Sequence, residues 1–465
     1  MDRLLRRLND VLQYARLTPF DTSTNEGRSR EMRRRALLTA AGSAFMRLFT
    51  FAVTIVSLRV ALPYLNAERY GVLAAVISLS GLLSFADLGI NNGLVSQIAR
   101  LDATRDGRAL AQLASDAIAL LSAIGVAMAI ILTCVCLVIP MHWLFKDAPD
   151  AVLGEARTTL IVFVLIFSAL LPLGAVQRIY MGLQEGYTWY LWCIPFVAVG
   201  LALVFILPRA GAGVPAFLMA VWGLQSFGSL PLLAVLRARG LLVRPSRRFW
   251  HAPHIRSLLS AGGFFFALQV ATQVGWASDS VFISAVLGPR AVAQFVVVER
   301  MFMLVLIPIS IISSPLWAAY SAAAATGNWS FVRHTLRHSL AINLTAAFLG
   351  SVVITLFGET LARVLTAGNV VPGTSFLVSY GVWVMLGAWN VAMGMYLNGL
   401  QVFSPQFWTS CSFAVVATLL KITVLPQAGV QSIPLINVAA FSLTILIPFA
   451  TVFRKRVFGL ARQSA

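Results

Sequence analysis

Twelve apolar runs, each long enough to cross a bilayer as a helix, constrain this chain more than any other feature. A transmembrane helix needs about 20 apolar residues. The runs do not alternate with the period of a barrel strand and are too long for one. They therefore predict an all-α integral membrane protein with about 12 transmembrane helices. The runs lie at about 36–63, 70–92, 115–140, 158–181, 187–207, 213–236, 257–286, 291–317, 338–357, 374–398, 406–425 and 429–452.

The distribution of charge predicts how these helices are oriented. The chain is 59% hydrophobic and 11% charged, with a net charge of +18. Most of the Lys and Arg residues fall in the two termini and in alternate connections, which is typical of cytoplasmic loops. Lys421 is counted with the few basic residues of the opposite side. The charge therefore predicts a multi-pass membrane protein with both termini cytoplasmic, and it argues against nucleic-acid binding.

The two halves of the chain resemble each other. Gly182-Leu183-Gln184 recurs as Gly399-Leu400-Gln401, and segment 212–239 recurs as 428–456. More weakly, YLNAERYGVL (64–73) aligns with VLGPRAVAQF (286–295). Six helices per half predict parallel repeats, hence two pseudo-symmetric six-helix lobes around a central cavity. We expect a cytoplasmic basic N-terminal tail at 1–35, an N-lobe at 36–237, a cytoplasmic basic linker at 238–256, a C-lobe at 257–453 and a cytoplasmic C-terminal tail at 454–465.

Several kinds of chemistry have no motif in this sequence. It contains no G-x-x-x-x-G-K-[ST], no H-E-x-x-H and no G-x-S-x-G. These motifs would indicate a nucleotide-binding loop, a zinc protease site and a hydrolase nucleophile. The four cysteines all lie in apolar runs, where inert thiols are expected. We therefore expect no ATP hydrolysis, no cofactor, no metal and no catalytic residue.

Charged residues inside the apolar runs are the remaining candidates for function. Arg47 and Arg300 lie too deep to reach the interface easily, so we expect them to face a wet cavity or a partner, as intramembrane charges usually do. Arg178 is close to the cytoplasmic end of its run, where it either snorkels to the interface or contacts substrate. Asp87 either caps the next helical turn or acts in transport. The charged candidates are therefore Arg47, Arg178 and Arg300 for substrate, and Asp87, Asp279 and Glu299 for an ion or a counter-ion.

The roles of Asp279 and Glu299 stay open between ion coupling and pairing with an arginine. At ~1.5 Å per residue, Asp279 and Arg300 would lie at a similar depth on adjacent antiparallel helices. The sequence therefore predicts that these two residues can form an ion pair, which would lower the cost of burying each charge.

The segments LPYLNAERYGVLAAVISLSGLLSFADLGINNGLVSQIAR and SDSVFISAVLGPRAVAQFVVVERMF, with the two GLQ turns, carry a family resemblance. From about residue 36 to 455 the chain resembles the polysaccharide transporter branch of the multidrug/oligosaccharidyl-lipid/polysaccharide (MOP) exporter superfamily, and most of all Wzx-type O-antigen flippases. This resemblance implies ion-coupled alternating access. It also implies an undecaprenyl-diphosphate-linked oligosaccharide as substrate, H⁺ or Na⁺ as coupling ion, and a glycan polymerase as a partner.

Three other functions are weighed against this one. A drug/cation antiporter of the same superfamily should prefer acidic cavities, whereas two deep arginines favour an anion. Flippases of peptidoglycan precursors also place arginines on helices 1 and 8, but they usually have fourteen helices. A polymerase or ligase of surface glycan should show a large periplasmic loop, and the longest outside connection expected here, about 141–157, is too short.

Overall fold

The structure is a computed structural model, and it describes residues 25–82, 86, 90–244, 274–314, 316–325, 329–400 and 402–453. All regular elements of this part of the chain are helices. Nine of them are long and apolar enough to cross a membrane. Because hydrocarbon offers no hydrogen-bond partners, a chain with these runs satisfies its backbone within helices. The all-α membrane fold expected from the sequence is confirmed.

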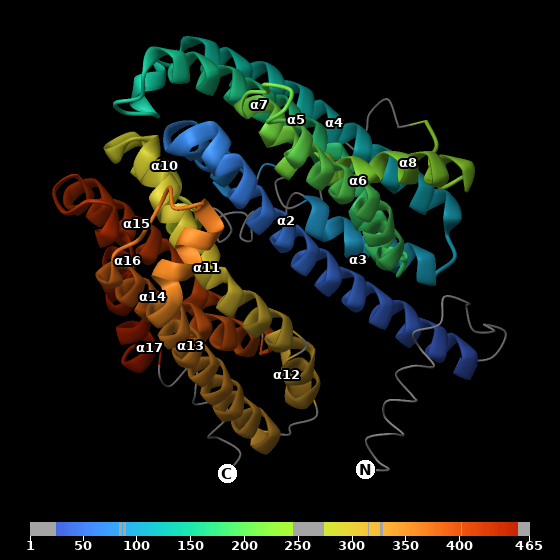
Figure 1. The fold of residues 1–465 in the computed structure, drawn as a ribbon. Coiled ribbons are helices and arrows are strands. Elements are labelled where there is room, and N and C mark those ends of the chain that lie inside the picture. Colours follow the sequence, from blue (N-terminus) through green and yellow to red (C-terminus); the bar gives the residue numbers. More distant parts are fainter. Residues whose placement is uncertain are drawn as a thin grey trace.

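The helices form two groups, coloured blue to green and yellow to red in Figure 1. The first contains α2 (Asn25–Leu82), α3 (Ile90–Ala103), α4 (Gly107–Val138), α5 (Asp150–Gly182), α6 (Gly186–Ile206), α7 (Val214–Leu218) and α8 (Ser229–Ala238). The second contains α10 (Asp279–Leu287), α11 (Pro289–Ser313), α12 (Leu316–Ala325), α13 (Trp329–Thr366), α14 (Thr374–Gly399), α15 (Phe403–Ala428), α16 (Ile433–Phe441) and α17 (Ile447–Ala450). We call these groups the N-lobe and the C-lobe. Helices α2 and α11 lie side by side between them (Figure 1).

The nine long helices agree with the twelve expected runs once three details are considered. Helix α2 contains the first run and part of the second, and its backbone breaks between these two runs at Asn66. The sixth run is divided between α7 and α8, with short π and 3-10 segments between them at Met219–Gly223 and Leu224–Gly228. Part of the seventh run lies outside the described residues. Asp87, most of the linker and both extreme termini lie outside them as well. Helix α2 also begins at Asn25, well before the expected start at residue 36.

The backbone confirms the weakest of the three sequence repeats. Asn66 has φ 61° and ψ 173°, and Gly288, which the alignment places opposite it, has φ 83° and ψ 168°. Glycine adopts positive φ freely, and asparagine is one of the few other residues that tolerate it. Each lobe thus breaks its chain in the same way, immediately before the helical segment that packs against the other lobe.

The other repeats also fall at equivalent places. Helix α5 ends at Gly182 and α14 at Gly399, so both GLQ segments follow the fourth span of their lobe. Both lobes also end in an interrupted helix with a five-residue π segment, at Met219–Gly223 and at Ser442–Leu446. The expected pair of pseudo-symmetric lobes is therefore confirmed.

The lobes approach each other closely at Gly71 on α2. A Cβ atom at this position would fall on the carbonyl oxygen of Pro289, the first residue of α11. No side chain larger than hydrogen fits there without a backbone shift. Gly71 therefore allows the two helices between the lobes to touch at one end, while farther along they line a cavity.

Candidate functional site

A cavity of about 560 Å³ lies between the lobes, and four helices supply its wall. Helices α2, α5 and α6 come from the N-lobe and α11 from the C-lobe. The lining residues are Ser43, Met46, Arg47, Thr50, Phe51, Thr54, Gln177, Trp189, Tyr190, Met303, Ile307 and Ser310. Volumes of roughly 300 to 1,000 Å³ are typical of small-ligand sites. The cavity is therefore large enough to take the polar part of a substrate.

Arg47 is the one charged residue among the described residues of this wall, and its side chain is exposed. It lies on the same face of α2 as Ser43, Thr50 and Thr54, because residues three or four apart share a helix face. That face is polar within the apolar run at 36–63. The structure thus places Arg47 in the cavity rather than in the protein core.

Arg300 lies at the edge of the same cavity, one turn before the lining residue Met303. Its guanidinium donates from Nη1 to the Met303 sulfur at 3.0 Å and lies 3.7 Å from the Glu299 carboxylate. Its side chain is 22% exposed, and its Nε atom has no hydrogen-bond partner in the part of the chain that the structure describes. A thioether is a weak acceptor, so Arg300 keeps donors for a better one.

The other candidates lie in different surroundings. Arg178 is half-buried on α5, next to the lining residue Gln177. Glu299, beside Arg300 on α11, is within electrostatic range of both Arg300 and Asp279. Asp87 falls outside the described residues. Among the described candidates, Arg47 lines the cavity, Arg300 lies one helical turn from the lining residue Met303, and Arg178 follows the lining residue Gln177 in the chain.

The predicted pairing of Asp279 with Arg300 is wrong. The Asp279 carboxylate pairs instead with Lys421 of α15, at 2.6 Å between Oδ1 and Nζ. Its other oxygen, Oδ2, accepts a hydrogen bond of 2.9 Å from the Asn437 side chain of α16. The expectation that Lys421 belongs to an outer connection is also wrong, because its side chain is 0% exposed. The signal visible in the sequence is that Lys421 lies within the apolar run at 406–425, where a charge needs a partner.

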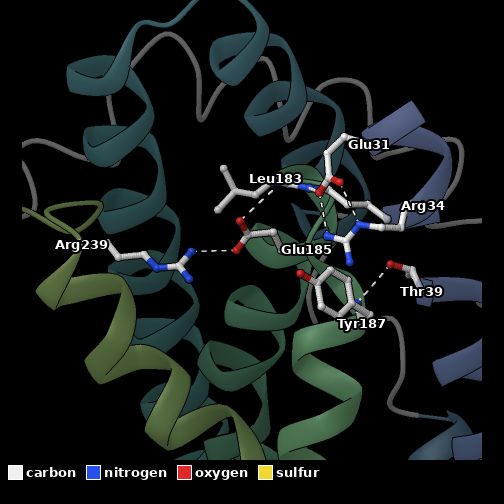
Figure 2. Close-up of polar contacts among 8 residues, drawn as sticks. Glu31, Arg34, Thr39, Leu183, Glu185, Tyr187 and Arg239 are labelled. Atoms are coloured by element: carbon white, nitrogen blue, oxygen red, sulfur yellow. Dashed lines mark hydrogen bonds and ion pairs between the residues drawn. The ribbon is translucent and has the colours of Figure 1, made fainter. Parts of the chain in front are cut away.

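A second polar constellation joins three elements at one end of the N-lobe, and Figure 2 shows it around Glu185. Glu185 follows the first GLQ turn, and its carboxylate lies 2.7 Å from Arg239 and 3.5 Å from Arg35. Arg35 in turn donates to Glu31, which also holds Arg34 through two hydrogen bonds of 2.7 and 2.8 Å. The hydrogen bond that Arg239 donates to the Glu185 carboxylate raises the pKa of the Arg239 guanidinium above its ordinary value. Glu185 therefore ties the start of α2 to the end of α8.

Replacing Glu185 by glutamine is expected to lower the free energy of unfolding by about 1 to 3 kcal/mol. The carboxylate is 19% exposed and serves two arginines, and hydrogen bonds to charged groups contribute about that much. Glu359→Gln is the matched control. Among the described residues its carboxylate pairs with Arg363 alone, and both side chains are more than half exposed. Such pairs contribute about 0 to 1 kcal/mol. Equal losses of thermal stability in the two variants would contradict a tying role for Glu185.

Comparisons with known proteins agree with this fold. An inward-facing structure of a multidrug resistance MATE family transporter of the MOP superfamily has a TM-score of 0.72 and 17% identity, covering 90% of this chain and 96% of that one. An outward-facing structure of a transporter of the same description reaches 0.60 at 16% identity, covering 92% and 96%. The lipid II flippase MurJ, in an inward closed conformation, reaches 0.67 at 14% identity, covering 90% and 87%. The fold is thus that of MOP superfamily transporters.

The sequence itself places the chain within that superfamily. The chain belongs to the polysaccharide biosynthesis protein family, whose profile matches residues 40–320. No curated protein matches it. Family and fold together define a multi-pass membrane transporter or flippase and point away from a catalytic enzyme.

Proposed function

We propose that this protein is a flippase that moves an undecaprenyl-diphosphate-linked oligosaccharide across the bacterial inner membrane by alternating access. The cargo would be the repeat unit of an O-antigen or exopolysaccharide. The observation that carries this proposal is an exposed arginine in the cavity between the lobes of a protein of the polysaccharide biosynthesis family. An arginine there favours an anionic cargo over a cationic drug.

The diphosphate is the part of such a cargo least able to cross hydrocarbon. A guanidinium suits it, because its planar fork donates two parallel hydrogen bonds to phosphate oxygens and stays charged at physiological pH. Arg47 supplies this fork from α2. Arg300, whose present acceptor is a thioether, turns to the phosphate from α11. Arg178 receives the anion near the margin, while the undecaprenyl tail stays in the bilayer.

Transport is driven by an ion gradient, with H⁺ or Na⁺ as the coupling ion. Glu299 is the carboxylate that we assign to coupling, because it pairs with Arg300, which lies one helical turn from the lining residue Met303. Asp279 serves as the counter-ion of Lys421. A polymerase takes the glycan on the far side. We keep Asp87 as a second coupling candidate, because it is a carboxylate within an apolar run of the sequence.

Reconstitution in liposomes tests this function. The substrate is a fluorescent undecaprenyl-diphosphate oligosaccharide placed in both leaflets, and an added impermeant glycosidase removes only what is outside. With the protein present, cleavage should pass the half that is exposed at the start and approach completion. Cleavage of a neutral glycolipid with the same sugars should stop at one half, because the protein should not move it between leaflets. Equal rates for both lipids, or expulsion of cationic dyes instead, would contradict the proposal.

The proposed orientation places both termini in the cytoplasm. Single cysteines at Arg244 and Arg333 should then resist an impermeant thiol reagent added to intact cells, because the membrane excludes it. Cysteines at Lys146 and Arg363 should react. The four native cysteines are first replaced by serine, and opened cells serve as the labelling control. Reaction of the Arg244 variant from outside would reverse the orientation.

A further inference from the structure

Lys421 is surrounded by oxygen atoms from two elements of the C-lobe. Its Nζ lies 2.6 Å from Asp279 Oδ1, 3.4 Å from the Gly275 carbonyl oxygen and 3.4 Å from Ser278 Oγ. The side chain is wholly buried. A buried charge costs several kcal/mol unless it is paired and hydrogen-bonded. These oxygens are therefore what keeps an ammonium group inside the lobe.

The chain around these oxygens is interrupted. The helix formed by 274–277 stops at Ser278, and α10 begins at Asp279. Carbonyl oxygens at such interruptions in transmembrane helices are known ligands for small cations. A carboxylate, a carbonyl and a hydroxyl are also the ligand types that hard cations prefer. The surroundings of Lys421 Nζ thus have the composition of a cation site.

Asn437 adds an independent observation. Its Nδ2 donates to Asp279 Oδ2 at 2.9 Å, which fixes the amide next to the carboxylate. The residue is 1% exposed, yet its Oδ1 has no hydrogen-bond partner among the described residues. A buried amide oxygen without a donor is costly for a folded protein. It is also a further oxygen ligand beside the same carboxylate.

We propose that Lys421 is a tethered cation that occupies a monovalent-cation site of the C-lobe. The ammonium neutralises Asp279 as a bound Na⁺ would, so the site of the native chain has no need of an ion from solution. Removing the side chain beyond Cβ leaves the oxygens in place and opens a site that takes Na⁺. This inference concerns the C-lobe alone and does not rest on the proposed cargo.

The test compares thermal stability in sodium chloride and in choline chloride at equal ionic strength. The wild-type protein should melt at the same temperature in both. Lys421→Ala should melt lower in choline and rise with sodium by about 3 °C or more at saturation, because a ligand that binds only the folded state stabilises it. Choline is too large for the site, so the difference reports binding rather than screening.

Two control variants separate a cation site from a merely destabilised lobe. Lys421→Met removes the charge but fills the same space, and Lys421→Ala with Asp279→Asn removes the carboxylate ligand. Neither should respond to sodium. For any variant that does not survive detergent, protease resistance in native membranes is measured in both salts and reports stabilisation by sodium in the same way. The inference is overturned if Lys421→Ala shows no sodium-specific gain, if the wild type shows an equal gain, or if either control does.

Discussion

Replacing Arg47 by alanine is expected to reduce transport of the lipid-linked glycan about 100-fold or more, with the protein present in the membrane at its normal level. The side chain is exposed in the cavity, so its removal leaves no buried partner without a charge. Under the proposed function, what is lost is the pair of hydrogen bonds from Arg47 to the diphosphate. A hydrogen bond to a charged group contributes about 1.5 to 3 kcal/mol, and about 3 kcal/mol corresponds to roughly 100-fold in affinity.

Arg59 provides the matched control for Arg47. It lies on the same helix and is also exposed, but it is outside the described lining of the cavity. The Arg59→Ala variant should transport at the wild-type rate in the liposome assay. The Arg47→Lys variant should have a rate between those of the wild type and Arg47→Ala, because it keeps the charge and loses the planar fork. If Arg47→Ala, present at normal abundance, still transports fully, then Arg47 does not hold the diphosphate.

Replacing Lys421 by methionine is expected to cost about 3 to 5 kcal/mol of folding free energy. Breaking a buried ion pair by removing one partner leaves the other charge uncompensated, and this is among the largest single-residue effects. The Asp279 carboxylate is 10% exposed, so water does little to replace the ammonium. The measurement is the unfolding transition of the purified protein in detergent.

A double variant shows whether the pair itself is responsible. Lys421→Met combined with Asp279→Asn is neutral and should recover most of the loss, since neither charge then remains buried. Lys146→Met is the control, because Lys146 is exposed. Additive losses in the double variant would mean that the two side chains do not depend on each other.

The sequence predicted the parts of the fold that follow from local physics. Apolar length predicted the spans, and the alignment of 64–73 with 286–295 predicted that the lobes repeat. The shared break at Asn66 and Gly288 could not be read from composition, because asparagine and glycine differ in size and polarity. They share only a tolerance for positive φ, and that becomes visible when the backbone is known.

The sequence predicted less about the site because partners are chosen by packing between distant helices. The depth of Asp279 in its apolar run correctly indicated that this residue needs a counter-charge. A comparison of depths on adjacent helices, however, offers partners from the neighbouring helix alone. The actual partner comes from α15, far along the chain. Aromatic wall residues such as Trp189 and Tyr190 were missed as well. In sequence they cannot be distinguished from the aromatic residues that face lipid.

The wall of the cavity is unequally shared, since nine of its twelve residues come from the N-lobe and three from the C-lobe. The paired lysine and aspartate, in contrast, belong entirely to the C-lobe. In a protein assembled from two repeats, this division lets the cavity wall and the buried ion pair change independently over evolution. Recombination within the linker would then exchange most of the cavity wall without exchanging the buried ion pair. Hybrids of related transporters joined there would take most of their cavity wall from the parent that donated the first half.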